Sequence, residues 1–504
     1  MSRARVILMS CLWLLAGHAL AADDSAPLMT LRYAGTQLQP AITVRSNGLS
    51  LNAYDTDNRL RWTYRFAQSG GSPCEGEAYL AALVQDENHD GLLNAAQGEQ
   101  ARLFASLRWR DGADPRSAVL ALDLSSPGPP RLLWRQDDQT VRGLAELVSA
   151  PTPARVRIAR SNQDPQHWVV LLGAGLPRAA SGSNAARDGS RLYALDARDG
   201  RLLWSAAART HNLADGGSAD QAFTGLAAAL PGGIAALDLD SDGYTDRLYV
   251  GDWQAGLWRF DLHNGQSAAQ LATGAALAQL ADPAAPQGRG FIAAPDVYRV
   301  AGTTGPQPGP DSLNIALGSV ATGQLPAARQ ALFVLHDRFG LSPLSQAQFD
   351  ALPALQDRDL PPLGPDGSSG VSADAAGFKL LLDGAQVLAR GLTSAGLLLF
   401  TQVASLQPLT GLNCSGKPLR VSLKVGALDA VTGRNVRDLN HDGHIDIADR
   451  AVALPGGWPL RTGLEPAPPG SPYSDTCRLG ESAFADCPPL PPPRRLYWLR
   501  SDAD

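Results

Sequence analysis

The feature that most constrains the fold of this chain is a short unit that recurs along its length. Each copy is an apolar strand that ends in aspartate, followed by a turn, and the three clearest copies continue to Trp62, Trp134 and Trp204. The strands end at Asp55, Asp123, Asp196, Asp261, Asp337 and Asp429. Hairpins repeated in this way are typical of a β-propeller, because a four-stranded blade buries its faces only against neighbouring blades. The alternative is a set of unrelated hairpins that share common turn chemistry.

The aspartates are 65 to 92 residues apart, which exceeds the about 40 to 50 residues of a minimal blade, so we expect insertions in each repeat. The chain of 504 residues has 51 glycines, 37 prolines and 18% charged residues, and this composition favours many short strands. We therefore predict an all-β chain, a β-propeller of seven modified blades with inserted calcium-binding loops.

The N-terminus has the pattern of a secretion signal. Arg3 and Arg5 precede the apolar run 6–15, and residues 19–21 fit a small-x-small cleavage site, which predicts a signal peptide over residues 1–21. A lipoprotein signal ending at Cys11 is the alternative. No later segment is long and apolar enough to span a membrane, so we expect an exported mature chain without a transmembrane segment. Its net charge, −6 for the whole chain and about −8 without the signal, argues against a nucleic-acid partner.

Four cysteines remain after residue 21: Cys74, Cys414, Cys477 and Cys487. In an oxidising compartment four cysteines allow three pairings. We expect a Cys477–Cys487 bond, which closes a short loop, and a Cys74–Cys414 bond between the first and last blades. Free buried thiols are the alternative.

Three segments have the oxygen-ligand spacing of a calcium loop. Loop 1 (86–97) offers Asp86, Asn88, Asp90, Leu92 through its carbonyl, and Asn94. Loop 2 (238–246) offers Asp238, Asp240, Asp242, Tyr244 through its carbonyl, and Asp246. Loop 3 (438–449) offers Asp438, Asn440, Asp442, His444 through its carbonyl, Asp446 and Asp449. We predict Ca²⁺ binding at loops 2 and 3, and structural turns without metal are the alternative for each loop.

Loop 1 is the weakest of the three metal candidates. Only Asp86 and Asp90 supply charge, and Gln97 at the twelfth position cannot act as a bidentate anion. No histidine pair with zinc spacing, nucleophile elbow, phosphate-binding loop or dinucleotide fingerprint occurs, so we predict no catalytic residues and no enzymatic activity.

Residues 248–262, LYVGDWQAGLWRFDL, closely follow loop 2. They resemble the "YAGDxxGNLWRFDL" motif in the C-terminal β-propeller of PilY-type (PilC-type) pilus-biogenesis proteins. Residues 42–62, 119–134 and 191–204 are similar to other strand pairs of that family. The large N-terminal region of full-length members, often with a von Willebrand A-like domain, has no counterpart in these residues, and no Arg-Gly-Asp tripeptide supports integrin-type adhesion.

The resemblance implies a role in type IV pilus biogenesis, with calcium tuning pilus extension or retraction, and with effects on twitching motility or adhesion. Implied partners are minor pilins or type IV pilus assembly proteins, or a host or surface ligand. The implied location is the periplasm, the outer-membrane surface or the pilus tip. Two alternatives share the repeat: a quinoprotein-like (PQQ-type) dehydrogenase and an outer-membrane assembly scaffold. The first commonly uses two adjacent cysteines, and this chain has no such pair.

We expect four segments along the chain. They are the signal peptide (1–21), the propeller (22–464), a proline-rich segment (465–493) and a C-terminal strand (494–504) that closes the propeller.

Overall fold

A computed structural model gives the structure of the chain. It describes residues 27–34, 41–46, 50–66, 77–88, 90–111, 114–141, 143–159, 166–176, 189–208, 220–301, 311–323, 328–364, 370–372, 375–394, 396–404, 423–440, 442–454, 462–465, 476–479 and 482–484.

The described strands form seven sheets of three or more strands, numbered here in chain order. Sheet 1 contains β1 (Pro27–Arg32), β2 (Ala41–Ser46), β3 (Ser50–Tyr54) and β4 (Leu60–Arg65). Sheet 2 contains β5 (Glu77–Gln85), β6 (Gln100–Asp111), β7 (Asp114–Asp123) and β8 (Arg131–Asp137). Sheet 3 contains β9 (Thr152–Arg157), β10 (Gln166–Gly173), β11 (Arg191–Asp196), β12 (Leu202–Ala207) and β13 (Asp220–Ala222).

Sheet 4 contains β14 (Ile234–Leu237), β15 (Arg247–Gly251), β16 (Gly256–Leu262), β17 (Ala272–Gln279) and β23 (Leu355–Gln356). Sheet 5 contains β19 (Asp296–Val300), β20 (Ser312–Gly318), β22 (Gln330–Asp337) and β24 (Gly377–Leu382). Sheet 6 contains β25 (Ala385–Gln386), β26 (Leu392–Ser394), β27 (Leu397–Ala404), β28 (Leu423–Asp429) and β29 (Val452–Leu454). Sheet 7 contains β30 (Thr462–Glu465), β31 (Thr476–Leu479) and β32 (Ser482–Phe484).

The remaining described elements are short. A two-stranded sheet pairs β18 (Arg289–Gly290) with β21 (Val320–Ala321). The helices are α1 (Gln346–Ala351) and the 3₁₀ turns η1 (Ala95–Gln97), η3 (Ala268–Gln270), η4 (Asp357–Asp359) and η6 (Ile447–Arg450). No helix in the described part of the chain is both long and apolar enough to cross a bilayer.

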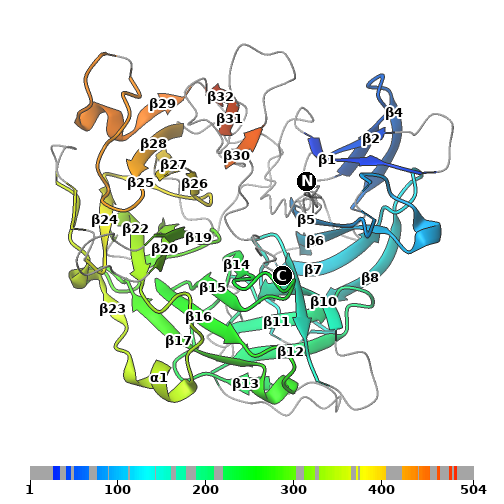
Figure 1. Ribbon diagram of the computed structural model, residues 1–504, viewed down its shortest axis with the longest axis horizontal. Helices are drawn as coiled ribbons and strands as arrows, with labels where there is room; N and C mark the ends of the chain where they lie inside the picture. Colours follow the sequence, from blue (N-terminus) through cyan, green and yellow to red (C-terminus); the bar gives the residue numbers. More distant parts are fainter. Residues whose placement is uncertain are drawn as a thin grey trace, which may run out of the picture.

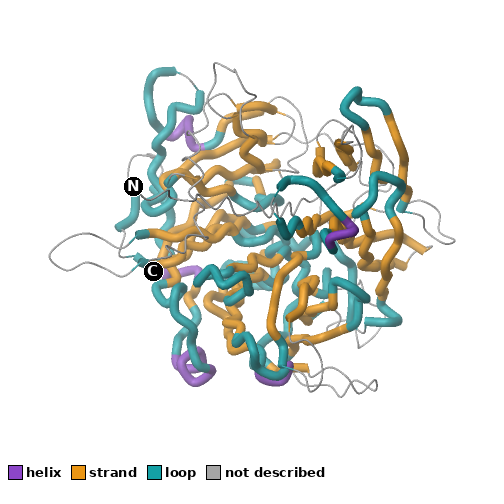
Figure 2. Tube along the Cα trace, turned by 45° about the vertical axis from the view of Figure 1, so that its right-hand side comes forward, coloured by secondary structure: helices purple, strands orange, loops and turns teal. Residues whose placement is uncertain are grey.

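The sheets follow one another around a common centre in sequence order (Figure 1). In a view turned by 45°, strands make up most of the molecule, and the helices are few and short (Figure 2). Strands within a sheet are antiparallel neighbours, except that β13 and β23 pair in parallel with β12 and β17. The predicted predominance of short strands is confirmed.

Every copy of the sequence repeat is the third strand of a sheet. These strands are β3, β7, β11, β16, β22 and β28. In the first three sheets the tryptophan lies on the fourth strand, opposite an alanine: Trp62 faces Ala53, Trp134 faces Ala121 and Trp204 faces Ala194. A register shift follows that alanine each time, so the three hairpins have the same geometry.

The repeated tryptophans also join one sheet to the next. Trp62 Nε1 donates to the carbonyl of Pro127 at 3.1 Å, and Trp134 Nε1 donates to Ala197 at 3.1 Å. Both acceptors lie in the turn between the third and fourth strands of the following sheet. The repeated tryptophans therefore connect neighbouring sheets at these two positions.

The hydrophobic core is divided into layers between consecutive sheets. Five buried clusters contain side chains of sheets 1 and 2, 2 and 3, 3 and 4, 4 and 5, and 5 and 6. Each buried Leu, Val or Phe contributes about 1.5–3 kcal/mol relative to exposure. The sheets are thus held face to face in sequence order, as the repeat requires.

Several predictions fall on residues outside the described ranges. These are the signal peptide (1–21), the closing strand (494–504) and three of the four cysteines that we expect to pair, Cys74, Cys414 and Cys487. Within the proline-rich segment the structure places β31 and β32, which pair with β30 to form sheet 7.

Candidate metal centre

The three predicted metal loops are connections between neighbouring strands of one sheet. Loop 1 joins β5 to β6, loop 2 joins β14 to β15, and loop 3 joins β28 to β29. The first two are first-to-second connections and the last is a third-to-fourth connection. Because direction alternates along an antiparallel sheet, both kinds of connection leave a sheet at the same end.

The loops share one backbone turn, which the side chains of their first, third and fifth positions hold in place. The first aspartate accepts from the amide of the sixth-position glycine at 2.9, 2.7 and 2.8 Å in loops 1, 2 and 3. The third-position side chain accepts from the fifth-position amide at 2.9, 3.0 and 2.9 Å. The fifth-position carboxylate accepts from the seventh-position amide at 2.7, 2.8 and 2.9 Å. The common spacing in the sequence therefore produces a common turn.

Glycine is required at the sixth position of each loop. Gly91, Gly243 and Gly443 have φ values of 78°, 88° and 87°. This left-handed conformation is disfavoured for residues with a Cβ atom, and glycine adopts it readily. Glycine therefore allows the sharp turn that directs the preceding oxygen atoms toward one point.

A further carboxylate closes each loop by accepting hydrogen bonds from backbone amides within the loop. In loop 2, Asp246 accepts from Leu239 N at 2.6 Å, and in loop 3, Asp449 accepts from Leu439 N at 2.7 Å. In loop 1 the closing side chain is Glu99, which accepts from Asn88 N at 3.4 Å and Asn94 N at 2.8 Å.

Glu99 was missed by the sequence reasoning. It is 1% exposed and lies two residues after Gln97, at the fourteenth position rather than the twelfth. The closing carboxylates of loops 2 and 3 are at the ninth and twelfth positions, so their offset differs in every loop. An acidic residue at the start of the next apolar strand was the available signal.

Loop 2 brings its carboxylates closest together. One oxygen from each of Asp238, Asp240 and Asp246 lies within 4.8 Å of the others, and no other such group occurs among the described residues. Asp238 is buried, Asp246 is half-buried and Asp240 is exposed. The triad is a group of hard oxygen donors, which suits a cation such as Ca²⁺.

Burial opposes ionisation of two of these carboxylates, those of Asp238 and Asp246. It raises the pKa of Asp238 to about 7; the amides of Gly243 and Ser241 lower that pKa, and the charges of Asp246 and Asp242 raise it. Burial also raises the pKa of Asp246. Carboxylates held together in this way favour either a proton or a cation between them.

The seventh-position carbonyls also fit a metal role. Among the described residues, nothing donates a hydrogen bond to the carbonyl of Leu92, Tyr244 or His444. A calcium loop uses the carbonyl at this position as a ligand. The side chain of His444 is exposed, and its role as a ligand through the carbonyl stays a prediction.

The predicted ligand atoms do not all lie close together. Asp242 is exposed and lies outside the triad. In loop 3, Asn440 Nδ2 donates to Asp442 Oδ2 at 3.0 Å, and the amide of His444 lowers the pKa of Asp442. In loop 1, Asn88 Nδ2 donates to Gln97 Oε1 at 3.1 Å. Metal binding by loops 1 and 3 stays a prediction.

Loop 2 is fixed to the preceding sheet through Tyr244. The buried ring lies beneath the guanidinium groups of Arg155 and Arg157 on β9, at 4.7 and 4.3 Å from its centroid. The amide of Thr245 donates to the carbonyl of Arg155 at 2.8 Å. The loop therefore contacts both sheet 4 and sheet 3.

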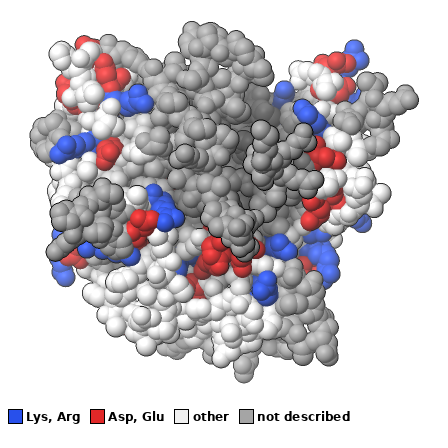
Figure 3. All heavy atoms as spheres, in the orientation of Figure 1, with Lys and Arg blue, Asp and Glu red and all other residues white. Residues whose placement is uncertain are grey.

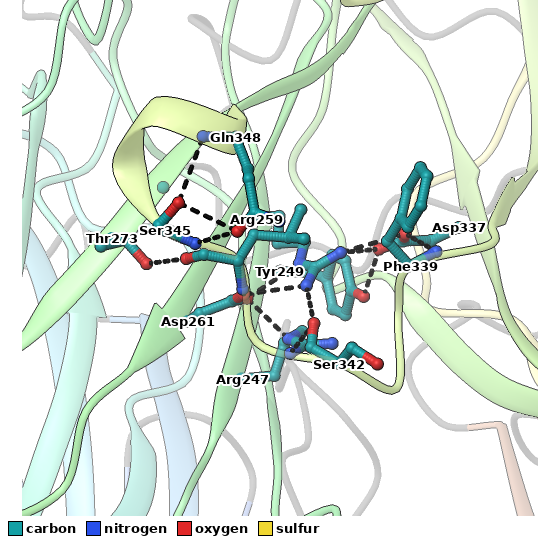
Figure 4. Close-up of polar contacts among 12 residues, drawn as sticks. Arg247, Tyr249, Arg259, Asp261, Thr273, Asp337, Phe339, Ser342, Ser345 and Gln348 are labelled. Carbon is teal, nitrogen blue, oxygen red and sulfur yellow. Dashed lines mark hydrogen bonds and ion pairs between the residues drawn. The ribbon is translucent and has the colours of Figure 1, made fainter. Parts of the chain in front are cut away.

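The LWRFD segment that follows loop 2 forms a buried charged network with sheet 5 (Figure 4). Arg259 forms ion pairs with Asp261 at 2.8 Å and Asp337 at 3.0 Å, and Arg247 forms one with Asp261 at 2.7 Å. Tyr249 donates to Asp337 at 2.8 Å. Two arginines and two aspartates balance in charge, which makes their burial tolerable.

The network continues into the segment before α1. Arg259 donates to the carbonyl of Ser342 at 2.7 Å, and Leu344 N donates to Asp261 at 2.7 Å (Figure 4). Ser345 then caps α1 by accepting from Gln348 N at 3.3 Å. The motif is thus structural and joins sheets 4 and 5.

Charge on the visible face is mixed. Figure 3 shows Asp and Glu side chains in the lower middle, at the upper left and along the right of this face, with Lys and Arg side chains next to them. The described residues on this face present no continuous basic surface of the kind that binds nucleic acid.

A search against protein-family models found no match. A PilY1 homologue of Xylella fastidiosa, described as a type IV pilus biogenesis factor, is 27% identical over 230 residues, which cover 44% of this chain and 16% of that protein. The type IV pilus biogenesis factor PilY1 of Pseudomonas aeruginosa is 29% identical over 144 residues, which cover 29% of this chain and 10% of that protein. The match thus spans only a small part of either relative.

The crystal structure of the P. aeruginosa PilY1 C-terminal domain superposes on this chain with a TM-score of 0.56. The two are 17% identical, and the superposition covers 89% of this chain and 93% of that domain. The chain is therefore homologous to PilY1 type IV pilus biogenesis factors and has the fold of their C-terminal domain.

Proposed function

We propose that this chain is an exported, calcium-binding β-propeller of seven blades that acts, without catalysis, in type IV pilus assembly, pilus extension or adhesion at the pilus tip. The observation that carries the proposal is the homology to PilY1, together with the carboxylate triad in loop 2. Its partners are minor pilins or other pilus assembly proteins, with a host or surface ligand as a further partner at the tip.

The seven-bladed ring is supported by the order of the sheets. Seven sheets of three or more strands succeed one another in the described residues, and five buried layers join consecutive pairs. Six sheets have a third strand that ends in or next to aspartate, and two of the tryptophans donate to the next sheet in the same way. Such repeated features support a ring of similar blades.

Calcium binding is supported by three features of loop 2. The triad of Asp238, Asp240 and Asp246 supplies charge, Gly243 allows the turn, and the Tyr244 carbonyl accepts no hydrogen bond from the described residues. Zinc is disfavoured because all of these donors are oxygens.

Calorimetric titration of the purified mature chain with CaCl₂ tests the metal site. The wild type should give saturable heat, and Asp238→Asn with Asp240→Asn should remove the contribution of loop 2. Asp57→Asn is the matched control, since its exposed carboxylate forms only a surface pair with Arg59. Wild-type protein that gives no heat would reject the calcium part of the proposal.

Deletion of the gene tests the pilus role. Loss of surface pili or of twitching that is restored by the wild-type gene would support that role, and the Asp238→Asn, Asp240→Asn gene should restore it poorly. Unchanged piliation, twitching and adhesion in the deletion strain would reject it. The alternative function, a PQQ-type dehydrogenase, would be excluded if the purified protein shows no absorbance from a bound quinone.

A further inference from the structure

The carbonyl that each candidate loop offers at its seventh position shares a peptide group with the amide of the eighth position. Because a peptide group is planar and trans, its C=O and N–H point in opposite directions. A hydrogen bond that holds the eighth amide therefore also fixes the direction of the seventh carbonyl. This direction matters for calcium, since a carbonyl has no net charge and is a ligand only when its oxygen points at the ion.

In loops 1 and 2 the eighth amide is held by a strand of the preceding sheet. In loop 1, Leu93 N donates to the carbonyl of Arg32, the last residue of β1, at 2.7 Å. In loop 2, Thr245 N donates to the carbonyl of Arg155 on β9 at 2.8 Å. In loop 3 the amide of Ile445 forms no hydrogen bond with a described residue. The seventh carbonyls of loops 1 and 2 therefore point away from a neighbouring strand that holds them.

Loop 2 is held by its seventh side chain as well. The ring of Tyr244 is 4% exposed and lies beneath the guanidinium groups of Arg155 and Arg157, at 4.7 and 4.3 Å from the ring centroid. The equivalent residue of loop 3, His444, has an exposed side chain. The two arginines of β9 thus hold the side chain of the residue whose carbonyl is the candidate ligand.

Asn264, in the turn after β16, completes the contact between β9 and loop 2. Its Nδ2 donates to the carbonyl of Thr245 at 2.9 Å, and its Oδ1 accepts from Arg157 N at 2.8 Å. Gly265 N also donates to the carbonyl of Arg157 at 2.7 Å. The peptide groups on both sides of Thr245 are therefore fixed by hydrogen bonds.

We propose that Arg155, Arg157 and Tyr244 are positioning residues for calcium at loop 2, because they direct the Tyr244 carbonyl toward the ion before the ion binds. The loop is then ordered when the chain folds, so ordering reduces the calcium affinity less than it would in a free loop. Linkage requires that calcium strengthen the contact between β9 and loop 2 by the same factor. The proposal rests on calcium binding at loop 2, as proposed above.

Calorimetric titration of the full mature chain with CaCl₂ tests these roles. Asp90→Asn and Asp442→Asn, present in every protein compared, remove a carboxylate from loops 1 and 3 and should limit the heat to loop 2. Tyr244→Leu keeps an apolar side chain in the buried position but removes the ring, and should raise the Kd about tenfold. Arg155→Lys with Arg157→Lys keeps both charges but removes the planar groups, and should raise the Kd by a smaller factor.

Tyr54→Leu is the matched control, since Arg45 lies over the Tyr54 ring at 4.6 Å on sheet 1. It should leave the Kd at loop 2 unchanged, and Tyr244→Phe, which keeps a ring, should change it by no more than about twofold. Hydrogen exchange measured by mass spectrometry gives a second readout. Calcium should slow exchange in the peptide that contains residues 152–157, and Tyr244→Leu should remove most of that effect.

The outcomes separate this proposal from calcium binding itself. If the protein with an unchanged loop 2 gives no heat, calcium binding at loop 2 is rejected, and the positioning role is rejected with it. Saturable heat with the same Kd in Tyr244→Leu would overturn the positioning role alone. If Tyr244→Leu does not fold, the double lysine variant decides, and an unchanged Kd in that variant would overturn the proposal.

Discussion

At Asp238 the protein opposes ionisation of a side chain that a calcium site needs ionised. Burial is the largest cause of its raised pKa of about 7, and the neighbouring carboxylates act in the same direction. An unfolded aspartate has a pKa of about 3.9. Between these two values the folded chain therefore binds more protons at this position than the unfolded chain does.

A pH dependence follows from this difference. Where the folded state binds more protons, the free energy of unfolding falls as pH rises, so metal-free protein should lose stability between about pH 4 and pH 7. Calcium competes with the proton and should raise the melting temperature more at pH 8 than at pH 5. Scanning calorimetry at both pH values measures this, and Asp238→Asn should reduce the difference. An equal calcium effect at pH 5 and pH 8 in the wild type would contradict it.

Glu99 gives a second prediction at the scale of one residue. Glu99→Gln should weaken calcium binding at loop 1 and lower the free energy of unfolding by about 1–3 kcal/mol, because the buried carboxylate accepts two loop amides. Calcium titration and urea unfolding measure the two effects. Glu87→Gln removes the same charge from an exposed neighbour and should change little. Equal effects of the two substitutions would show that Glu99 has no special role.

At these loops, spacing predicted the turn but not every carboxylate that closes it. The regular intervals from Asp238 to Asp242 determine local hydrogen bonds, so they could be interpreted without a structure. The closing carboxylate is reached only when the chain returns, and the length of that return differs between loops. Glu99 was missed for this reason.

At the scale of secondary-structure elements, the sheets are joined by groups that lie far apart in the sequence. Arg259 on β16 and Asp337 at the end of β22 form an ion pair across 78 residues, and both are buried. Arg259 reaches Asp261 on its own strand as well. The network therefore fixes the relative positions of sheets 4 and 5.

Arg259→Leu should lower the free energy of unfolding by roughly 3–5 kcal/mol, because it leaves Asp261 and Asp337 buried with less compensation. Urea unfolding followed by fluorescence measures the change. Arg299→Leu is the control, since Arg299 forms an exposed pair with Asp311 worth about 0–1 kcal/mol. Similar losses from both substitutions would mean that the buried network contributes no more than a surface pair.

The sequence predicted the third strands well and their partners poorly. A strand that ends in aspartate is a local pattern, and all six copies occupy equivalent places. Asp337 was recognised only as a loose copy of this repeat. Its contacts with Arg259 and Tyr249 depend on how two sheets meet, and no spacing within either strand indicates that.

At the scale of the whole molecule, two of the candidate metal loops connect one sheet to another. Loop 1 pairs with the end of β1, and loop 2 pairs with β9 and holds Tyr244 beneath two arginines. A ligand that orders such a loop stabilises the contact between the sheets as well as the loop itself.

Calcium should therefore raise the melting temperature of the whole chain by several degrees relative to chelator. A site filled at roughly 100 times its Kd contributes about 2.7 kcal/mol to the free energy of unfolding. Calorimetry of the mature chain in calcium and in EDTA measures this, with magnesium as the control because it fits a flexible oxygen site less well. Superimposable transitions in calcium and EDTA would contradict a structural role for the ion.

The position of the three loops gives the molecule a polarity. All of them leave their sheets at the end where first strands turn into second strands, whereas the second-to-third connections lie at the opposite end. If all three loops bind Ca²⁺, a change in its concentration would directly affect the surface at this end of the sheets. The structure of the surface at the opposite end would change little. A protein bound at that opposite end would stay bound while contacts at the end with the loops were made or released.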